Sequence, residues 1–206
     1  MAELRHKLRA PVRTLYDDLV TRLTQAATAD GALKEGDAFP EFALPDAGGK
    51  FVLSSDLLKS GPLVVTFYRG QWCPFCAATM EAMSATTPMI AAAGATVIGV
   101  SAEVGHMSRS TSRKSDLNFK MLSDVDNGLA LQCGLLFRLT DEIVRVYDAQ
   151  GPDLAKTYGN TSGFLPIPAT YIVLPSGTIG RAYINPDFRY RMEPQDILRS
   201  LAELSR

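Results

Sequence analysis

Two apolar runs with a helical segment between them constrain the fold of this chain more than any other feature. The run LVVTFY (63–68) has the length of a strand and no polar alternation, which is typical of a strand buried on both faces. A helical pattern follows from about Pro74 to Ala92, and ATVIGV (95–100) is a second buried strand. This β-α-β order predicts parallel strands joined by a right-handed crossover, and therefore an α/β fold.

The flanking patterns predict the remaining elements. An amphipathic helix that ends at 29–31 is indicated by apolar residues at steps of three and four: Leu4, Leu8, Val12, Leu15, Leu19 and Leu23. We also expect small strands and turns over 36–62, helices over 103–118 and 126–137, a strand at 121–122, a hairpin over 170–184, and a final helix from Pro194 to about Leu204. The pattern over 138–166 is ambiguous, with a helix over 141–147 as one option.

Composition bounds the class of protein. The chain has 206 residues, 46% hydrophobic and 21% charged, with a net charge of −1. We expect an N-terminal helical extension over 1–30 and one main domain over 31–206. Without a basic block, neither nucleic acid nor an anionic membrane is an expected partner. No apolar run approaches the roughly 18 residues of a membrane span, and the charged start MAELRHKLRAPVRTL is no secretory signal, so we expect a cytoplasmic location.

The segment RGQWCPFC (69–76) places two cysteines where the first buried strand passes into the helix. Pro74 suits the first helical position, which puts Cys73 at the helix N-terminus and Cys76 one turn inside it. Residues three apart share a helix face, so the two sulfurs can close into a disulfide. Unpaired N–H groups and the helix dipole favour a thiolate there. A thiolate beside a second thiol can attack a disulfide or a peroxide, and the partner then resolves the adduct.

Zinc sites use the same cysteine spacing, but zinc usually needs four ligands. The other candidates, Cys133, His6 and His106, contain no second close pair. A haem attachment would need His after the second cysteine, where this chain has Ala77. We therefore expect redox chemistry without a metal or cofactor.

The segment VTFYRGQWCPFC (65–76) resembles both branches of the thioredoxin superfamily. Its WCPFC resembles the W-C-x-x-C of thioredoxins, and IPATY (167–171) is similar to the segment carrying their active-site cis-proline. Upstream, GDAFP (36–40) with FAL (42–44) and Gly49 resembles the opening of the alkyl hydroperoxide reductase and thiol-specific antioxidant family, the peroxiredoxins. The resemblance covers about 36–200 and implies a thioredoxin-like fold, a central mixed sheet flanked by helices, with the N-terminal helix added to it.

The chain departs from the peroxiredoxin pattern P-x-x-x-T/S-x-x-C. Laid on this sequence, the peroxidatic cysteine falls on Cys76, the Thr/Ser on Cys73 and the proline on Arg69. Peroxiredoxins also place an arginine near the position of Pro168. The thioredoxin pattern makes Cys73 the attacking thiolate and the peroxiredoxin pattern makes it Cys76, so the choice stays open.

Three residues are candidates for supporting roles. Arg69 lies in the loop after the strand, where it either stabilises thiolate or peroxide or simply faces solvent. Trp72 either forms a docking surface beside the cysteines or packs in the core. Pro168 stands at the cis-proline position that the resemblance implies.

Other polar and nucleophilic residues are expected to be structural. Cys133 lies in an apolar helical stretch, which favours a buried thiol over a resolving cysteine. His106 is expected at the surface. The arginine-rich end, Arg181 and Arg189 to Arg191 (RYR), is expected to be a solvated face, with a weaker option of lying beside an anionic thiol partner.

The leading hypothesis is a thiol peroxidase that reduces hydrogen peroxide or organic hydroperoxides through a sulfenic acid, with thioredoxin or a small thiol as electron donor. The alternatives are a thiol–disulfide oxidoreductase without peroxidase activity and a non-catalytic module whose cysteines hold a metal or a static disulfide. The N-terminal helix either packs on its own domain or forms a homodimer contact.

Overall fold

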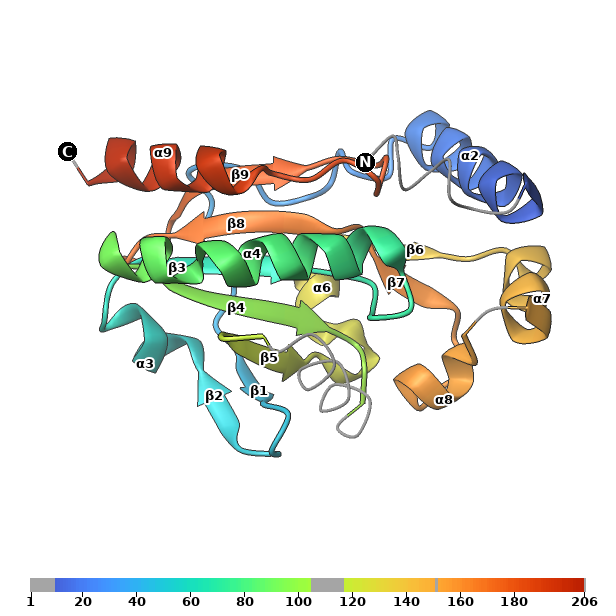
Figure 1. Cartoon of the computed structure of the whole chain (residues 1–206), viewed down its shortest axis with the longest axis horizontal. Coiled ribbons are helices and arrows are strands. Elements are labelled where there is room, and N and C mark those ends of the chain that lie inside the picture. Colours follow the sequence, from blue (N-terminus) through green and yellow to red (C-terminus); the bar gives the residue numbers. More distant parts are fainter. Residues whose placement is uncertain (1–9, 105–116, 151, 206) are drawn as a thin grey trace.

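The structure, a computed structural model, describes residues 10–104, 117–150 and 152–205. Its centre is a five-stranded mixed sheet of order β5-β4-β3-β8-β9 (Figure 1). Three strands are parallel: β3 (Leu63–Phe67), β4 (Thr96–Ser101) and β5 (Lys120–Ser123). The antiparallel hairpin of β8 (Ala169–Val173) and β9 (Ile179–Ile184) continues the sheet from β3. The predicted β-α-β unit and C-terminal hairpin are confirmed.

Both faces of the sheet are covered, which explains why β3 is an uninterrupted apolar run. Val64 packs on one face with Met83 of α4 (Pro74–Ala92) and Ile197 of α9 (Pro194–Leu204). Val65 packs on the other face with Leu129 of α6 (Gly128–Gln132). Since adjacent strand residues point to opposite faces, a strand buried on both sides must be apolar throughout. The expected mixed sheet with flanking helices is therefore confirmed.

Smaller elements surround this core. Two short two-stranded sheets pair β1 (Ala43–Pro45) with β2 (Phe51–Leu53) and β6 (Leu136–Arg138) with β7 (Phe164–Pro166). The short helices are α3 (Ser54–Leu58), the 3-10 helix η1 (Val125–Asn127), α7 (Asp141–Gln150) and α8 (Leu154–Tyr158). The helical option over 141–147 is confirmed by α7, whereas the helix α3 within 36–62 was not anticipated.

The predicted helix over 126–137 is wrong. Its centre is helical only over α6, and Leu136 already belongs to strand β6. The cause is Gly134, whose φ of +67° ends the helix. A Cβ at that position would lie 2.2 Å from the Gly31 carbonyl oxygen, so only glycine fits. In the predicted helix over 103–118, the described ends 103–104 and 117–118 are not helical, and 105–116 lie outside the described residues.

The amphipathic N-terminal helix is present as α2 (Ala10–Gln25), which ends before the expected 29–31. It packs Tyr16, Leu19 and Leu23 into the same core as Phe75 of α4 and Tyr147 of α7. Figure 1 shows α2 at the end of the molecule near α7 and the N-terminal end of α4. Within the described part of the chain, no helix is long and apolar enough to cross a membrane.

Candidate functional site

The site lies in the loop that joins β3 to α4. Cys73 is the N-cap residue of α4, Pro74 opens the helix, and Cys76 lies in its first turn, as the sequence predicts. The Cys73 carbonyl accepts a hydrogen bond from the Ala77 N–H at 2.9 Å. Both cysteines are free thiols with no exposed surface. Both sulfurs therefore lie at the N-terminal end of α4 and are shielded from solvent.

A buried polar network fixes the shape of this loop. The Glu103 carboxylate accepts hydrogen bonds from the Tyr68 hydroxyl and the Gln71 N–H, both at 3.0 Å. Gly70 has a φ of +151°, and a Cβ there would lie 2.6 Å from Trp72 Nε1. On the other side, the Trp72 indole N–H donates to the Tyr158 hydroxyl at 2.8 Å. That hydroxyl in turn donates to the Arg69 carbonyl, so the loop is held at both ends.

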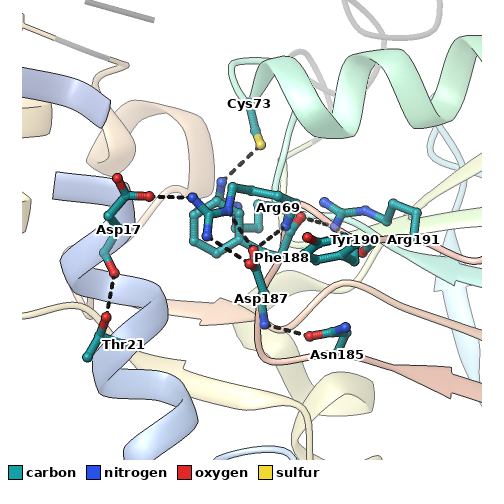
Figure 2. A network of polar contacts seen from close by, with 10 residues as sticks. Asp17, Thr21, Arg69, Cys73, Asn185, Asp187, Phe188, Tyr190 and Arg191 are labelled. Carbon is teal, nitrogen blue, oxygen red and sulfur yellow. Dashed lines mark hydrogen bonds and ion pairs between the residues drawn. The ribbon is translucent and has the colours of Figure 1, made fainter. Parts of the chain in front are cut away.

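Arg69 is fully buried and points at the cysteines rather than at solvent (Figure 2). Its Nη2 donates to Cys73 Sγ at 3.0 Å, and its backbone N–H donates to Cys76 Sγ at 3.5 Å. The guanidinium lies 3.6 Å from the ring centroid of Phe188, with Trp72 at 5.1 Å. Nε and Nη1 make no hydrogen bond within the described structure. The solvent-facing alternative for Arg69 is therefore wrong.

A second arginine reaches the pair from a distant part of the chain. Arg191 Nη2 lies 3.5 Å from Cys76 Sγ, and its Nη1 donates to the carbonyls of Phe188 and Tyr190. The arginine-rich end is therefore not simply a solvated face, because Arg189 is also only 16% exposed. No sequence pattern links Arg191 to a cysteine 115 positions away.

Burial and hydrogen bonding separate the two thiols. Burial raises the pKa of both, but the Cys73 thiol donates its hydrogen bond to Cys76, whose pKa is further lowered by Arg191, Arg69 and the Arg69 N–H. The pKa of Cys76 therefore lies well below its ordinary value, whereas that of Cys73 lies well above it. These directions favour the negative charge on Cys76 and the proton on Cys73.

The other candidates are distributed as follows. Trp72 is partly buried and packs edge-on against Tyr147 at a centroid distance of 5.2 Å, which favours its structural role. Pro168 is buried just before β8 with a trans peptide bond, so the cis arrangement is wrong. Cys133 packs in a different apolar cluster from the pair, and burial raises its pKa to about 12. His6 and His106 lie outside the described residues.

Sequence reasoning missed several residues of the site, among them Tyr16, Glu103, Tyr158 and Phe188. The sequence does contain a signal for Tyr16. It shares the helix face of the apolar residues Val12 and Leu19, and of these three residues it alone carries a hydroxyl group. Glu103 follows the buried strand β4 and is 1% exposed. A carboxylate directly after a buried strand is a position where functional or structural polar groups gather.

Known proteins include several that are similar to this chain in structure or in sequence. The crystal structure of peroxidoxin BcpB from Mycobacterium tuberculosis aligns over 84% of this chain and 98% of that one, with a TM-score of 0.66 and 19% identity. Peroxiredoxin Q from the chloroplast of Triticum aestivum is 31% identical over 63% of this chain and 60% of its own length. Peroxiredoxin Bcp of Escherichia coli K12 is 31% identical over 50% of this chain and 65% of its own length.

The chain thus spans less than two thirds of the length of these two relatives. The family model has a wider match, because it extends from the loop before β1 into β9. Its alignment covers residues 36–182 and includes both cysteines. The protein belongs to the AhpC/TSA family.

Proposed function

We propose that this protein is a thiol peroxidase in which Cys76 attacks the peroxide and Cys73 resolves the product. The carrying observation is that Cys76 Sγ lies within 3.5 Å of both the Arg191 guanidinium and the Arg69 backbone N–H. Membership of the AhpC/TSA family supports the reaction class. In the family pattern, Cys76 also holds the position of the peroxidatic cysteine.

The reaction balances as two displacement steps. The Cys76 thiolate attacks one peroxide oxygen and the O–O bond breaks, so that Cys76 becomes a sulfenic acid and the departing alkoxide or hydroxide takes up a proton from water. The Cys73 thiol then forms the S–S bond and releases water. Two thiol equivalents, from thioredoxin or a small thiol, return the disulfide to two thiols. Two arginines beside the sulfur would stabilise the negative charge that moves to the departing oxygen.

The position of Arg191 suggests how this chain compensates for its departures from the peroxiredoxin pattern. Peroxiredoxins place an arginine near the position that Pro168 occupies here. In this chain, a cation reaches Cys76 from residue 191 instead. A second one, the guanidinium of Arg69, lies against Cys73, and Arg69 stands where the pattern has proline. The charge of the usual peroxide pocket is thus supplied from different positions.

A thiol–disulfide oxidoreductase is the second candidate, because Trp72 and the two cysteines keep the thioredoxin pattern. The absence of exposed surface on both sulfurs argues against it. A protein disulfide has to reach a sulfur directly, and so does thioredoxin as electron donor, so the buried pair favours a small peroxide as substrate and a small thiol as donor.

The test is rapid mixing of the reduced protein with peroxide, for wild type, Cys73→Ser and Cys76→Ser. We expect Cys73→Ser to react as fast as wild type and to accumulate a sulfenic acid, and Cys76→Ser to react no faster than a free thiol. If Cys76→Ser retains the fast reaction, the roles are reversed. If wild type itself reacts no faster than a free thiol, the peroxidase proposal fails and disulfide exchange becomes the function to assay.

A further inference from the structure

Two segments outside the family alignment close the site. Helix α2 ends at Gln25, before the alignment begins at residue 36, and the segment 185–192 follows its end at residue 182. The first contributes Tyr16 and the second contributes Phe188 and Arg191. Both covering segments thus lie outside the residues that the family model matches.

Aromatic side chains from these segments meet over Arg69 and the start of α4. Tyr16 packs edge-on against Phe188 with ring centroids 5.2 Å apart and an interplanar angle of 90°. Both rings also contact Phe75, which lies between the cysteines in sequence, at 6.2 and 6.3 Å. Tyr16 and Phe188 each lie against the Arg69 guanidinium. This contact excludes water from the cation and from the sulfur beside it.

One ion-pair network joins the two segments. Arg189 donates from Nε and Nη2 to the two carboxylate oxygens of Asp187, each at 2.7 Å, and from Nη1 to Asp17 of α2. The side chains of Arg189 and Asp187 are 16% exposed, and that of Asp17 is 35% exposed. A bidentate, largely buried arginine pair is stronger and more directional than an exposed one. The contact from Asp17 therefore anchors α2 to the segment.

The same segment aims Arg191 at Cys76. The Asn185 side chain accepts the Asp187 N–H at 2.9 Å, which fixes the start of the turn. Arg191 donates to the Phe188 and Tyr190 carbonyls of that turn (Figure 2). Its Nη2 lies 3.5 Å from Cys76 Sγ. The position of the guanidinium therefore depends on the conformation of the turn that Arg189 holds.

We propose that Asp17 and Arg189 are positioning residues: their ion pair fastens α2 to the 185–192 segment as a cap that holds Arg191 on Cys76 and covers the sulfurs. The consequence for peroxide reduction rests on the proposed function. The effect on the Cys76 thiol does not rest on the proposed function, because the cap would stabilise the thiolate and limit access to it whatever the substrate is.

Iodoacetamide alkylation of the reduced, full-length protein tests the cap without using peroxide. The rate at Cys76 is followed across pH by mass spectrometry of its peptide, for wild type, Asp17→Asn and the control Asp18→Asn. Asp18 is the neighbouring residue on α2, and its exposed side chain makes no ion pair with the described residues. We expect Asp17→Asn to move the midpoint of the pH profile upward by about 0.5 to 1 unit, a threefold to tenfold change in thiolate population below it. We also expect its high-pH plateau to rise, since the cap opens.

Loss of a merely structural contact would lower thermal stability and leave the midpoint in place. A midpoint for Asp17→Asn equal to that of Asp18→Asn would overturn the proposal. If Asp17→Asn does not fold, the same midpoint is measured for Arg189→Lys. This variant keeps the positive charge but cannot bind both carboxylates in a forked, bidentate geometry. A shifted midpoint in a protein without peroxidase activity would support the cap and reject the proposed function.

Discussion

Replacement of Arg69 by Met should make the Cys73–Cys76 disulfide harder to reduce. In the reduced protein, the buried guanidinium lies beside the thiol pair, with Nη2 3.0 Å from Cys73 Sγ. When the pair forms a disulfide, the negative charge disappears and the cation stays in its aromatic surroundings. The cation therefore stabilises the reduced form selectively and raises the reduction potential.

The magnitude follows from Coulomb's law. The charge centre of Arg69 lies roughly 4 Å from Cys73 Sγ, which gives about 4 kcal/mol at an effective dielectric constant of 20. With the charge on Cys76, as proposed above, the guanidinium acts on the farther sulfur and the value falls to about 3 kcal/mol. This energy corresponds to about 60 mV for a two-electron couple. Loss of the guanidinium also raises the Cys76 pKa.

Equilibration with glutathione buffers, followed by alkylation and mass spectrometry, measures the potential. We expect Arg69→Met to lower it by about 60 mV, Arg69→Lys to lower it by less, and the surface control Arg138→Met to leave it unchanged. The side chain of Arg138 is 56% exposed, so the control removes one positive charge at a distance. A folded Arg69→Met protein with an unchanged or higher potential would refute the electrostatic reasoning.

Three further predictions concern single side chains. Arg191→Gln should raise the Cys76 pKa, because it removes one of the two nearby guanidinium groups, here a partly solvated one. In wild type, the peroxide rate should fall as pH drops through the lowered pKa of Cys76, and in the variant this fall should begin at higher pH. Tyr158→Phe leaves the buried Arg69 carbonyl and the Trp72 indole N–H without a partner, so it should cost about 1–3 kcal/mol in a urea titration; an unchanged unfolding free energy would show that water replaces the hydroxyl. Cys133→Ala should keep the peroxide rate within about twofold and lower the unfolding free energy by about 1–2 kcal/mol; a large loss of rate would identify Cys133 as a redox partner.

The sequence predicts the centre of this fold well because local signals agree there. LVVTFY is apolar on both faces, Pro74 marks a helix start, and Pro194 marks another. The stretch around Cys133 misleads, because a short apolar run fits a buried helix or a strand equally well. Gly134 was the available signal, but its backbone conformation depends on the close approach of Gly31.

The site was predictable only in part, for a related reason. Cys73, Cys76 and Arg69 lie within eight residues of one another and share one loop, so local geometry relates them. Arg191 and Tyr16 come from segments on either side of the sheet in sequence. Helical periodicity puts Tyr16 on the buried face of α2. The approach of Tyr16 and Arg191 to the cysteines, however, depends on tertiary packing and on the Asp17–Arg189 ion pair.

The positions of α2 and the 185–192 segment in the chain have a consequence during translation. The ribosome releases α2 before any strand of the central sheet, and it releases Arg191 only after all five. A nascent chain that already carries both cysteines therefore lacks one of the two guanidinium groups that lower the Cys76 pKa. Its thiols should be less reactive toward oxidants while the chain is still incomplete, and full reactivity should develop only once the C-terminal turn has folded onto α2.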